Sequence, residues 1–512
     1  MGRVVSGKRE ISTDQLNENA ARGAQGLKAQ GIREGDSVAL FMRNDFAFFE
    51  VSLAAGMVGA YPVPVNWHFN REEAGYIFRD SCAKLIVAHG DLFALIEAEV
   101  PPGVPVLLVE TPDEIREAYS LLPDQCELPP KSNRWLDTWE AWLSQFEPLE
   151  ADDSQAPGSM IYTSGTTGHP KGVRRNRPTQ QEAARALALN KIMYGLEDHL
   201  TTVMCGPMYH SAPNNFGARC VRTGGTVVLL PRFDAETLLQ VIERERVTHL
   251  FMVPVMFIRL LKLPIAQRQS YDLSSLKFVV HAAAPCPPHV KQQMIDWWGP
   301  IIHEYYGATE TGGISFCTSE EWLSHPGTVG KILPGVDIRF LDEQGEDVAP
   351  GDVGEIYTRN HGLADFVYQG DPEKRRNIEV DGMISAGDMG YWDEEGYLYI
   401  SDRRKDMVIS GGVNIYPAEI EAELQRLPGL QDCAVFGIPD AEYGESLCAV
   451  IEPEKGVLLD EDTVRQFLRA HLAGYKVPKH IEFKDKLPRE DSGKIFKRKL
   501  REPYWRESGR KI

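Results

Sequence analysis

Short apolar runs alternate with longer amphipathic stretches over most of the chain, which is the pattern of strands joined by helices. Such alternation indicates a parallel sheet whose strands are connected by crossover helices. The pattern therefore predicts an α/β fold with two doubly wound α/β layers. The runs predicted as strands are Val38–Met42, Tyr61–Val65, Leu85–Ala88 and Val104–Val109 in the first layer, and Thr226–Leu230, His249–Pro254 and Lys277–His281 in the second.

Two changes of pattern mark further units in the last third of the chain. Residues Gly327–Glu355 form short β-rich pieces punctuated by Gly, Pro and Asp, which predicts a small β-barrel-like subdomain. The segment Ser401–Pro417 is charged and then glycine-rich, as is typical of a linker that opens a new unit. We therefore expect a large N-terminal domain over residues 1–404 and a small, mobile C-terminal α+β domain over residues 405–512.

The bulk composition narrows the class of protein. A chain of 512 residues is too long for one hydrophobic core and indicates two or more domains. The net charge of −19 argues against non-specific nucleic-acid binding, which depends on neutralising phosphates. Eight cysteines without a CxxC pair indicate neither a zinc ribbon nor a disulfide framework. No apolar run approaches the length that spans a bilayer, and we predict a cytoplasmic protein.

The segment Tyr162–Gly172 reads YTSGTTGHPKG and has the composition of a polyphosphate-binding turn. Glycines let backbone N–H groups approach phosphate oxygens, hydroxyls donate further hydrogen bonds, and a lysine adds positive charge. It is not a Walker loop, because His169 and Pro170 separate Gly168 from Lys171 and Gly172 follows the lysine. An ordinary Gly/Thr-rich turn without a ligand is the simpler alternative. The residues predicted to bind phosphate are Thr163, Ser164, Gly165, Thr166, Thr167, Gly168 and Lys171.

A second cluster, HEYYGATETGG, covers His303–Gly313 and is predicted to be a loop at the C-terminal edge of a strand, where open α/β sheets bind ligands. Mg²⁺ prefers carboxylate and water ligands while it bridges phosphate oxygens. Glu310 is therefore a candidate metal ligand and Thr309 a candidate phosphate donor. Taken alone, Glu310 would more simply be an exposed loop residue, so its interpretation as a ligand depends on the first motif.

Both clusters resemble motifs of the adenylate-forming superfamily, which includes acyl-CoA synthetases, luciferases and the adenylation domains of peptide synthetases. YTSGTTGHPKG is similar to its phosphate-binding signature, and Tyr306–Glu310 matches its YG-x-TE element. The motifs continue in the expected order with Asp388, Arg403, the segment ISGGVNIYP and Lys494. The resemblance covers essentially the whole chain. It looks most similar to bacterial long-chain fatty-acid and crotonobetaine/carnitine-type CoA ligases.

The resemblance implies a nucleotide site around these motifs, with the adenine stacked near Tyr306. Asp388 would accept hydrogen bonds from the ribose hydroxyls, and Arg403 would reach ribose or phosphate. One departure leaves individual adenine contacts open, because HAAAP at His281–Pro285 replaces the usual GGAP; a second difference is that Asp402 replaces a usual glycine. Beside the phosphate turn, the expected nucleotide contacts are Ala283, Glu304, Tyr305, Tyr306, Gly307, Ala308, Thr309, Asp388, Arg403 and Lys494.

The resemblance also implies that the small domain completes the site. Lys494 would touch both the acyl carboxylate and the α-phosphate, and Lys405 would be the hinge about which the domain turns. The glycines of ISGGVNIYP would line a pantetheine channel, although a tight turn would also explain them. The expected catalytic residues are Lys494, Glu310, Thr163 and His210, with Glu310 as the metal ligand. The expected CoA contacts are Ser410, Gly411, Gly412 and Lys476.

Positions beside the motifs predict a mostly small and apolar acyl pocket, which favours a hydrophobic acid. His210 in PMYHSAPNNF is interpreted as a gate, because an ionised carboxylate has no proton for a general base to remove. No aspartate occurs between Tyr209 and Phe216 to hold a substrate ammonium, so an amino acid is not favoured. The predicted pocket residues are His210, Ser211, Ala212, Val253, Val255, Ala282, Tyr305 and Gly312.

Together these features predict an ATP-dependent carboxylic acid:CoA ligase that forms an acyl-adenylate and then a thioester, with ATP, CoA and Mg²⁺ as cofactors. Fatty, aryl and polycyclic acids all fit the pocket. One alternative is a freestanding adenylating enzyme that loads a carrier protein. Another is a catalytically silent nucleotide-binding protein, which would be expected to have lost Lys494 or Glu310. The expected partners are the acid, ATP and CoA, without nucleic acid or an integral membrane segment, and with a homodimer as an option.

Overall fold

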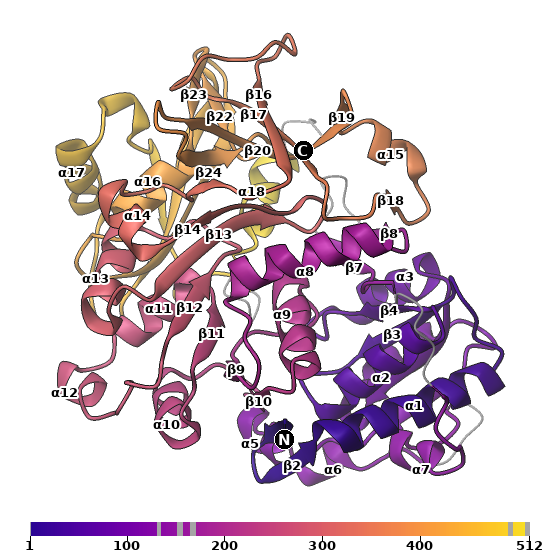
Figure 1. The fold of residues 1–512 in the computed structure, drawn as a ribbon. Helices are drawn as coiled ribbons and strands as arrows, with labels where there is room; N and C mark the ends of the chain where they lie inside the picture. Colours follow the sequence, from indigo (N-terminus) through magenta and orange to yellow (C-terminus); the bar gives the residue numbers. More distant parts are fainter. Residues whose placement is uncertain (1, 131–134, 151–156, 164–169, 490–494, 507–512) are drawn as a thin grey trace.

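The computed structural model describes residues 2–130, 135–150, 157–163, 170–489 and 495–506. Figure 1 shows two α/β layers and a β-rich region, and the last elements of the chain form a separate, smaller unit. The predicted α/β class, with a large N-terminal domain and a smaller C-terminal domain, is therefore confirmed.

The first layer is a four-stranded parallel sheet in the order β4-β3-β5-β6. Leu40 of β3, for example, pairs with Pro64 of β4 on one side and with Val87 of β5 on the other. The alternation of strands and helices predicted for this part of the chain is therefore correct. The strands are β3 (Ser37–Phe41), β4 (Tyr61–Pro64), β5 (Ala83–His89) and β6 (Val106–Val109). The helices are α1 (Thr13–Ala29), α2 (Phe46–Met57), α3 (Arg71–Asp80), α4 (Gly90–Ile96), the 3₁₀ helix Glu97–Glu99, α5 (Asp113–Tyr119), α6 (Pro123–Cys126) and α7 (Trp139–Leu143).

The second layer is a nine-stranded mixed sheet in the order β15-β14-β13-β12-β11-β9-β10-β1-β2. Its strands are β1 (Arg3–Ser6), β2 (Arg9–Ser12), β9 (Thr201–Met204), β10 (Thr226–Leu229), β11 (His249–Met252), β12 (Phe278–His281), β13 (Ile302–Ala308), β14 (Gly312–Cys317) and β15 (Lys331–Ile332). Its helices are α8 (Gln180–Tyr194), α9 (Ser211–Arg222), α10 (Ala235–Glu245), α11 (Pro254–Leu261), α12 (Ile265–Arg268), α13 (Pro288–Trp298) and α14 (Ser319–Ser324).

The sequence predicted β10, β11 and β12 but missed the N-terminal hairpin β1–β2. β1 joins the second sheet, not the first, and pairs in parallel with β10, with Val4 opposite Val227. A strand of four residues whose partner lies this far along the chain leaves no local periodicity to read. The first strands of the chain therefore belong to the second layer, the strands β3 to β6 form the first layer, and the chain then re-enters the second layer at β9.

The β-rich region extends further than predicted, from β16 to the end of β21. It is an antiparallel five-stranded sheet in the order β16-β17-β20-β19, with β21 paired to β20, and it occupies the place of the predicted β-barrel-like subdomain. A three-stranded sheet, β18-β8-β7, lies between it and the first layer. The elements are β7 (Ile161–Thr163), β8 (Lys171–Arg175), β16 (Val336–Leu341), β17 (Gly354–Asn360), β18 (Phe366–Tyr368), α15 (Pro372–Arg376), β19 (Glu379–Val380), β20 (Met383–Trp392) and β21 (Leu398–Arg403).

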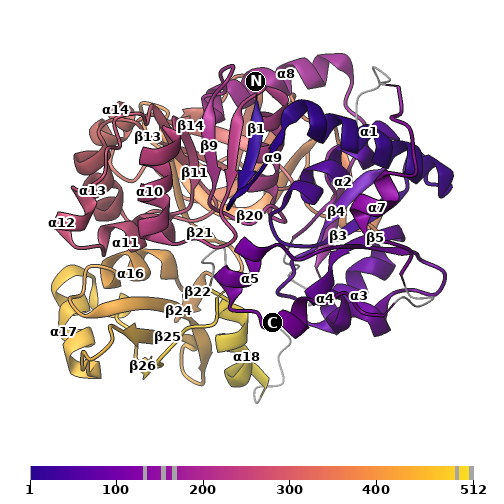
Figure 2. The same cartoon turned by 90° about the horizontal axis from the view of Figure 1, so that it is seen from below.

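The C-terminal domain has its own sheet, in the order β23-β22-β25-β24 with β26 beside β25. Figure 2 shows it lying against α11 and α13 of the second layer, where Lys262 forms an ion pair with Glu454 at 3.2 Å. The elements are β22 (Val408–Ser410), β23 (Val413–Ile415), α16 (Pro417–Leu424), β24 (Leu430–Asp440), β25 (Gly444–Pro453), α17 (Glu461–His471), the 3₁₀ helix Gly474–Lys476, β26 (His480–Phe483) and α18 (Lys497–Arg506).

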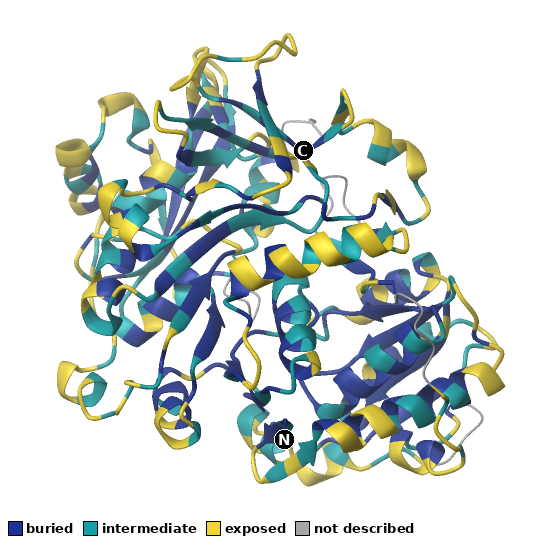
Figure 3. Cartoon of the chain, in the orientation of Figure 1, coloured by how far each residue is buried: buried dark blue, intermediate teal, exposed yellow. Residues whose placement is uncertain are grey.

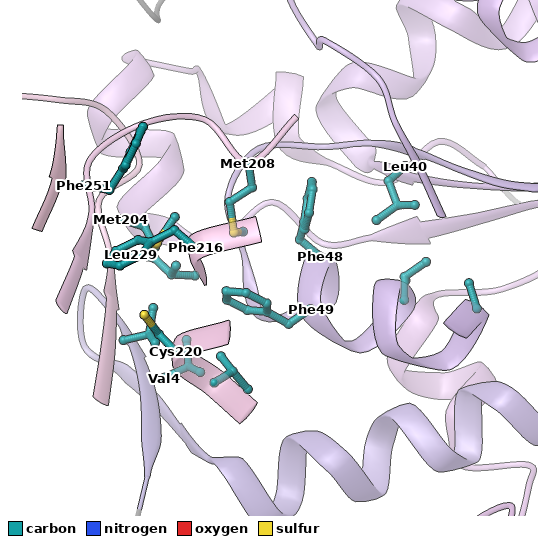
Figure 4. Close-up of a cluster of buried hydrophobic side chains, with 14 of the residues drawn as sticks. Val4, Leu40, Phe48, Phe49, Met204, Met208, Phe216, Cys220, Leu229 and Phe251 are labelled. Carbon is teal, nitrogen blue, oxygen red and sulfur yellow. The ribbon is translucent and has the colours of Figure 1, made fainter. Parts of the chain in front are cut away.

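The largest hydrophobic core connects the two layers. Strands are mostly buried, whereas the helices expose one face (Figure 3). Figure 4 shows where the layers meet, with Phe48 and Phe49 of α2 facing Phe216 of α9 and Phe251 of β11. Aromatic side chains bury a large apolar area each, so this contact holds α9 firmly between the layers.

Candidate active site

The flanks of the predicted phosphate turn are the strands of a hairpin, β7 and β8, in which Thr163 pairs with Lys171. Gly172 is needed opposite Tyr162, because a Cβ there would lie 2.8 Å from the tyrosine ring. The hairpin therefore places Thr163 and Lys171 next to each other where the turn begins and ends. The predicted phosphate contacts that lie outside the described residues are Ser164, Gly165, Thr166, Thr167 and Gly168.

Glu310 lies in the turn Thr309–Thr311 between β13 and β14. The expectation of a loop over His303–Gly313 is therefore wrong: most of the cluster is a β-hairpin, because strand pairing satisfies its backbone groups. The Glu310 carboxylate accepts hydrogen bonds from Thr163 Oγ1 at 3.2 Å and from the Tyr368 hydroxyl at 3.1 Å. The turn thus brings the predicted metal ligand to the end of β7.

Two residues that the sequence did not single out hold this turn in place. Arg175, at the end of β8, donates hydrogen bonds to the carbonyl oxygens of Thr309 and Glu310, both at 2.7 Å. Burial lowers the pKa of Arg175 to about 10, so it stays charged at neutral pH. The ring of Tyr368 on β18 lies 5.2 Å from the Lys171 ammonium. In the sequence, the only indication of this role for Arg175 is that a basic residue follows the turn after Lys171, and nothing indicates a role for Tyr368.

Tyr306, Asp388 and Arg403 form a second group. Asp388 on β20 pairs with Arg403 on β21, and Arg403 Nε lies 3.4 Å from Asp388 Oδ1. The Tyr306 hydroxyl donates a hydrogen bond to Asp388 Oδ2 at 2.7 Å. Burial, and then the Asp388 charge, raises the pKa of Tyr306, so the phenol keeps its proton and remains a donor. Three predicted nucleotide contacts, distant in sequence, are thus neighbours.

Other predicted nucleotide contacts have different surroundings. Glu304 accepts a hydrogen bond from the fully buried Lys291 Nζ at 2.6 Å, so its carboxylate is engaged in an internal ion pair. Ala283 has a φ of +74°, in the left-handed region that favours glycine. The remaining contacts, which line the same cavity as Ala283, are Tyr305, Gly307, Ala308 and Thr309.

A cavity of about 2430 Å³ joins both groups to the acyl side. His210 immediately precedes α9, the helix that the core in Figure 4 holds between the layers. The predicted acyl-pocket residues all line this cavity, namely His210, Ser211, Ala212, Val253, Val255, Ala282, Tyr305 and Gly312.

Asn44 fixes the loop that leads to His210. Its Nδ2 donates to the Gly206 carbonyl oxygen at 2.9 Å, and its Oδ1 accepts from the Met208 backbone N–H at 2.8 Å. Asn214 of α9 donates to the Met208 carbonyl oxygen at 3.0 Å. Only 7% of Asn44 is exposed, so its loss would leave buried backbone groups without partners. The sequence gave no sign of this role, because Asn44 lies in the other layer.

A model of the AMP-binding enzyme family matches residues 3–368, and one of the AMP-binding enzyme C-terminal domain matches residues 419–494. The chain belongs to the AMP-binding enzyme family. The sequence-based assignment to this family, and to its AMP-forming acid–thiol ligases, is confirmed.

Relatives of this AMP-binding enzyme match it over nearly its whole length. Feruloyl-CoA synthase of an Amycolatopsis species is 34% identical and covers 98% of this chain and 95% of its own. The fatty acid–[acyl-carrier-protein] ligase ScoC of Streptomyces coeruleorubidus is 30% identical, with 99% and 94% covered. The crystal structure of ATP-bound MatB from Rhodopseudomonas palustris has a TM-score of 0.83 at 28% identity, with 98% and 96% covered.

The C-terminal domain of this AMP-binding enzyme covers part of the cavity. Ile495, Phe496 and Lys497 line it, together with residues of α16. Lys497 Nζ lies 2.8 Å from Glu421 Oε1 of α16. Lys494, the predicted adenylation lysine, lies outside the described residues.

The predicted hinge lies where the two domains meet. Asp402, the departure from a usual glycine, accepts a hydrogen bond from the Ala418 backbone N–H at 2.9 Å, at the start of α16. Burial, and then the positive charge of Arg403, lowers the pKa of Lys405. Arg501 Nη1 donates to the Lys405 carbonyl oxygen at 3.3 Å. The segment around Lys405 therefore contacts both α16 and α18.

The predicted CoA contacts lie away from the cavity in this arrangement. Gly411 and Gly412 form the two-residue turn between β22 and β23, with φ values of +58° and +83°. Both values favour glycine, so the tight turn, the alternative explanation for these glycines, is present whether or not they also line a pantetheine channel. Lys476 forms an ion pair with Glu419 at 2.6 Å. None of Ser410, Gly411, Gly412 and Lys476 is among the described residues that line the cavity.

The metal chemistry of the site rests on few protein groups. Within the described ranges, no group of three or more His, Cys, Asp and Glu side chains could hold a metal ion. A single carboxylate with a hydroxyl beside it, Glu310 with Thr163, still fits Mg²⁺, which takes most of its ligands from phosphates and water.

Among the described helices, none is long and apolar enough to cross a membrane.

Proposed function

We propose that this AMP-binding enzyme joins a hydrophobic carboxylic acid to CoA through an acyl-adenylate. The observation that supports this most is the single cavity that connects Glu310 and Lys171, the Tyr306–Asp388 pair, and the apolar residues beyond His210. Fatty, aryl and polycyclic acids fit such a lining. The proposed division of the chain is an N-terminal domain over residues 1–404 and a mobile lid over residues 405–512.

In the first step, an oxygen of the acid attacks the α-phosphorus of ATP, the new O–P bond forms, and pyrophosphate leaves. Two anions must approach each other, and at about 4 Å and an effective dielectric near 20 one opposing charge is worth roughly 4 kcal/mol. Lys171, Arg403 and Lys494 are proposed to supply that charge. When bound, Mg²⁺ would neutralise phosphate charge, and Glu310 with Thr163 would hold it.

In the second step, the thiol of CoA attacks the acyl carbonyl and gives up its proton to solvent, the C–S bond forms, and AMP leaves with the electrons of the C–O bond. The proposed route for the thiol passes Ser410, Gly411, Gly412 and Lys476, which do not line the cavity in the present arrangement. Rotation of the C-terminal domain about Lys405 is therefore part of the proposal.

The two steps can be separated experimentally. Lys494→Ala should abolish acyl-AMP formation, measured as acid-dependent pyrophosphate release, but spare thioester formation from supplied acyl-AMP. Gly411→Leu should do the reverse, because its side chain would narrow the thiol route. Lys455→Ala, an exposed lysine of the same domain, is the matched control. Equal loss of both activities in Lys494→Ala would contradict the assigned role.

An acceptor other than CoA is the second candidate, because the relative ScoC is named as a ligase of fatty acids to an acyl carrier protein. Thioester formation on a phosphopantetheinyl carrier protein but not on CoA would establish it. A catalytically silent protein is less consistent with Glu310 placed beside Thr163. A cytoplasmic location and a homodimer stay predictions.

A further inference from the structure

One face of α9 places a row of polar side chains along the acyl part of the cavity. Asn215, Arg219 and Arg222 are spaced by four and three positions, which puts them on the same side of the helix. All three line the cavity. Phe49 and Leu53 of α2 also line the cavity and add apolar surface. This part of the pocket is therefore amphipathic and not uniformly apolar.

The two arginines differ in exposure, since Arg219 is partly buried and Arg222 is exposed at the end of α9, but neither has an acidic partner among the described residues. The buried Arg43, for comparison, pairs with Asp91 at 2.9 Å. Neither Arg219 nor Arg222 forms an ion pair with any carboxylate in the part of the chain that the structure describes. The hydrogen bond that Arg219 makes is a long one, from Nε to Asn215 Oδ1 at 3.4 Å. Burial lowers the pKa of Arg219, as expected for a partly buried guanidinium without a carboxylate beside it.

The polar row continues toward the nucleotide. Asn215 Nδ2 donates to Asn190 Oδ1 at 3.3 Å and to the Tyr194 hydroxyl at 3.4 Å. The Tyr194 hydroxyl lies 3.5 Å from that of Tyr305. These bonds are all near the long limit of hydrogen bonding, so a ligand with stronger acceptors can replace them at little cost. A plain alkyl chain would cover these polar groups without satisfying them.

We propose that the acid activated by this enzyme carries a second anionic group, a distal carboxylate, which Arg219 and Arg222 bind at the far end of the acyl pocket. This inference rests on the proposed function and specifies its substrate class. A carboxylate would form charge-assisted, bidentate hydrogen bonds with the Arg219 guanidinium, whose hydrogen bond to Asn215 is long. The apolar side of the pocket, with Phe49 and Leu53, then binds the middle of the molecule.

The geometry of α9 also sets the length of the substrate. His210, at the gate, precedes Arg219 by nine residues and Arg222 by twelve, which corresponds to about 13 to 18 Å along a helix. With bonds of about 1.5 Å, a staggered chain advances about 1.25 Å per bond, so roughly ten to fourteen bonds separate the two carboxylates. A medium-chain α,ω-dicarboxylic acid is the simplest probe.

The test compares a diacid with the monoacid of the same chain length. We expect kcat/KM, measured by pyrophosphate release, to favour the diacid in the wild-type enzyme. In Arg219→Met the ratio of diacid to monoacid should fall about 10- to 100-fold, the range for a lost hydrogen bond to a charged group. Arg219→Lys should keep part of the preference, and Arg33→Met, at an exposed position outside the cavity, should keep all of it. Because two substrates are compared in one protein, a folding defect does not change the ratio.

A binding measurement separates this inference from the proposed function. The diacid and the monoacid are each titrated into wild type and Arg219→Met by calorimetry, with AMP in place of ATP and without CoA, so that no adenylation takes place. Weaker binding in the variant supports the distal-carboxylate site even if no thioester forms with any acid, a result that would overturn only the proposed reaction. Equal binding of diacid and monoacid, or a ratio that Arg219→Met leaves unchanged, would overturn the inference.

Discussion

The two ends of the cavity treat charge differently. At the nucleotide end, each acidic group already has partners: Glu310 accepts hydrogen bonds from two hydroxyls, and Asp388 contacts Tyr306 at 2.7 Å and Arg403 at 3.4 Å. At the acyl end, Arg219 has a single hydrogen bond of 3.4 Å among the described residues. The nucleotide end is therefore preorganised for ATP, which is the same in every reaction. The acyl end has an arginine without an acidic partner, which the substrate acid can supply.

The largest effect is expected where the preorganised end meets the phosphates. Glu310→Gln keeps the size and the acceptor oxygen of the side chain but removes its charge. We expect pyrophosphate release to fall about 10²- to 10³-fold, because charge stabilisation of the reacting phosphates is lost. The Mg²⁺ concentration that gives half-maximal activity should be higher in the same variant than in the wild type.

Glu343→Gln, at an exposed position of the β-rich region, is the control for Glu310→Gln. Its rate and Mg²⁺ dependence should match those of the wild type. If Glu310→Gln had the same effect as this control, the nucleotide end would not depend on the charge of Glu310, and the comparison between the two ends would fail.

A smaller effect is expected at the pair of Tyr306 and Asp388. Asp388→Asn weakens the bond from the tyrosine hydroxyl and the contact with Arg403, so the KM for ATP should rise about 10- to 100-fold. The KM for the acid should stay within about twofold, because that ligand binds at the other end. Steady-state kinetics with each substrate varied in turn would show the split. A parallel rise in both KM values would mean that the two ends are coupled.

The smallest effect is expected at Asn44, which supports the acyl gate from the other layer. Asn44→Ala leaves two buried backbone groups without partners and should lower the free energy of unfolding by about 1 to 3 kcal/mol. The KM for the acid should rise a few-fold, on the order of 1 kcal/mol, while the KM for ATP does not. Thermal unfolding and kinetics measure the two effects, with Asn17→Ala on the exposed side of α1 as the control. If the KM for the acid were unchanged, Asn44 would contribute to the stability of the fold but not to binding of the acid.

Local patterns were sufficient for part of this picture. The alternation of apolar runs predicted the strands of the first sheet, and the motif around Thr163 and Lys171 indicated the phosphate turn. The HEYYGATETGG cluster was wrongly expected to be a loop, because glycines favour turns locally even where a hairpin needs them for close strand contact. Arg175, Tyr368 and Asn44 were missed because each acts on a residue that is remote in sequence.

By itself, the sequence determined the family, the order of the motifs and the chemistry that each motif can offer, since these depend on residue type and short-range spacing. Only the tertiary structure decided which groups meet. It paired Asp388 with Arg403 and Tyr306, and it directed the carboxylate of Glu304 into an ion pair with Lys291. It also placed Arg219 and Arg222 at the cavity lining without an ion pair to any carboxylate of the described residues. The reason is physical: the free energy of a charge depends on its surroundings, which strands and helices from distant parts of the chain supply.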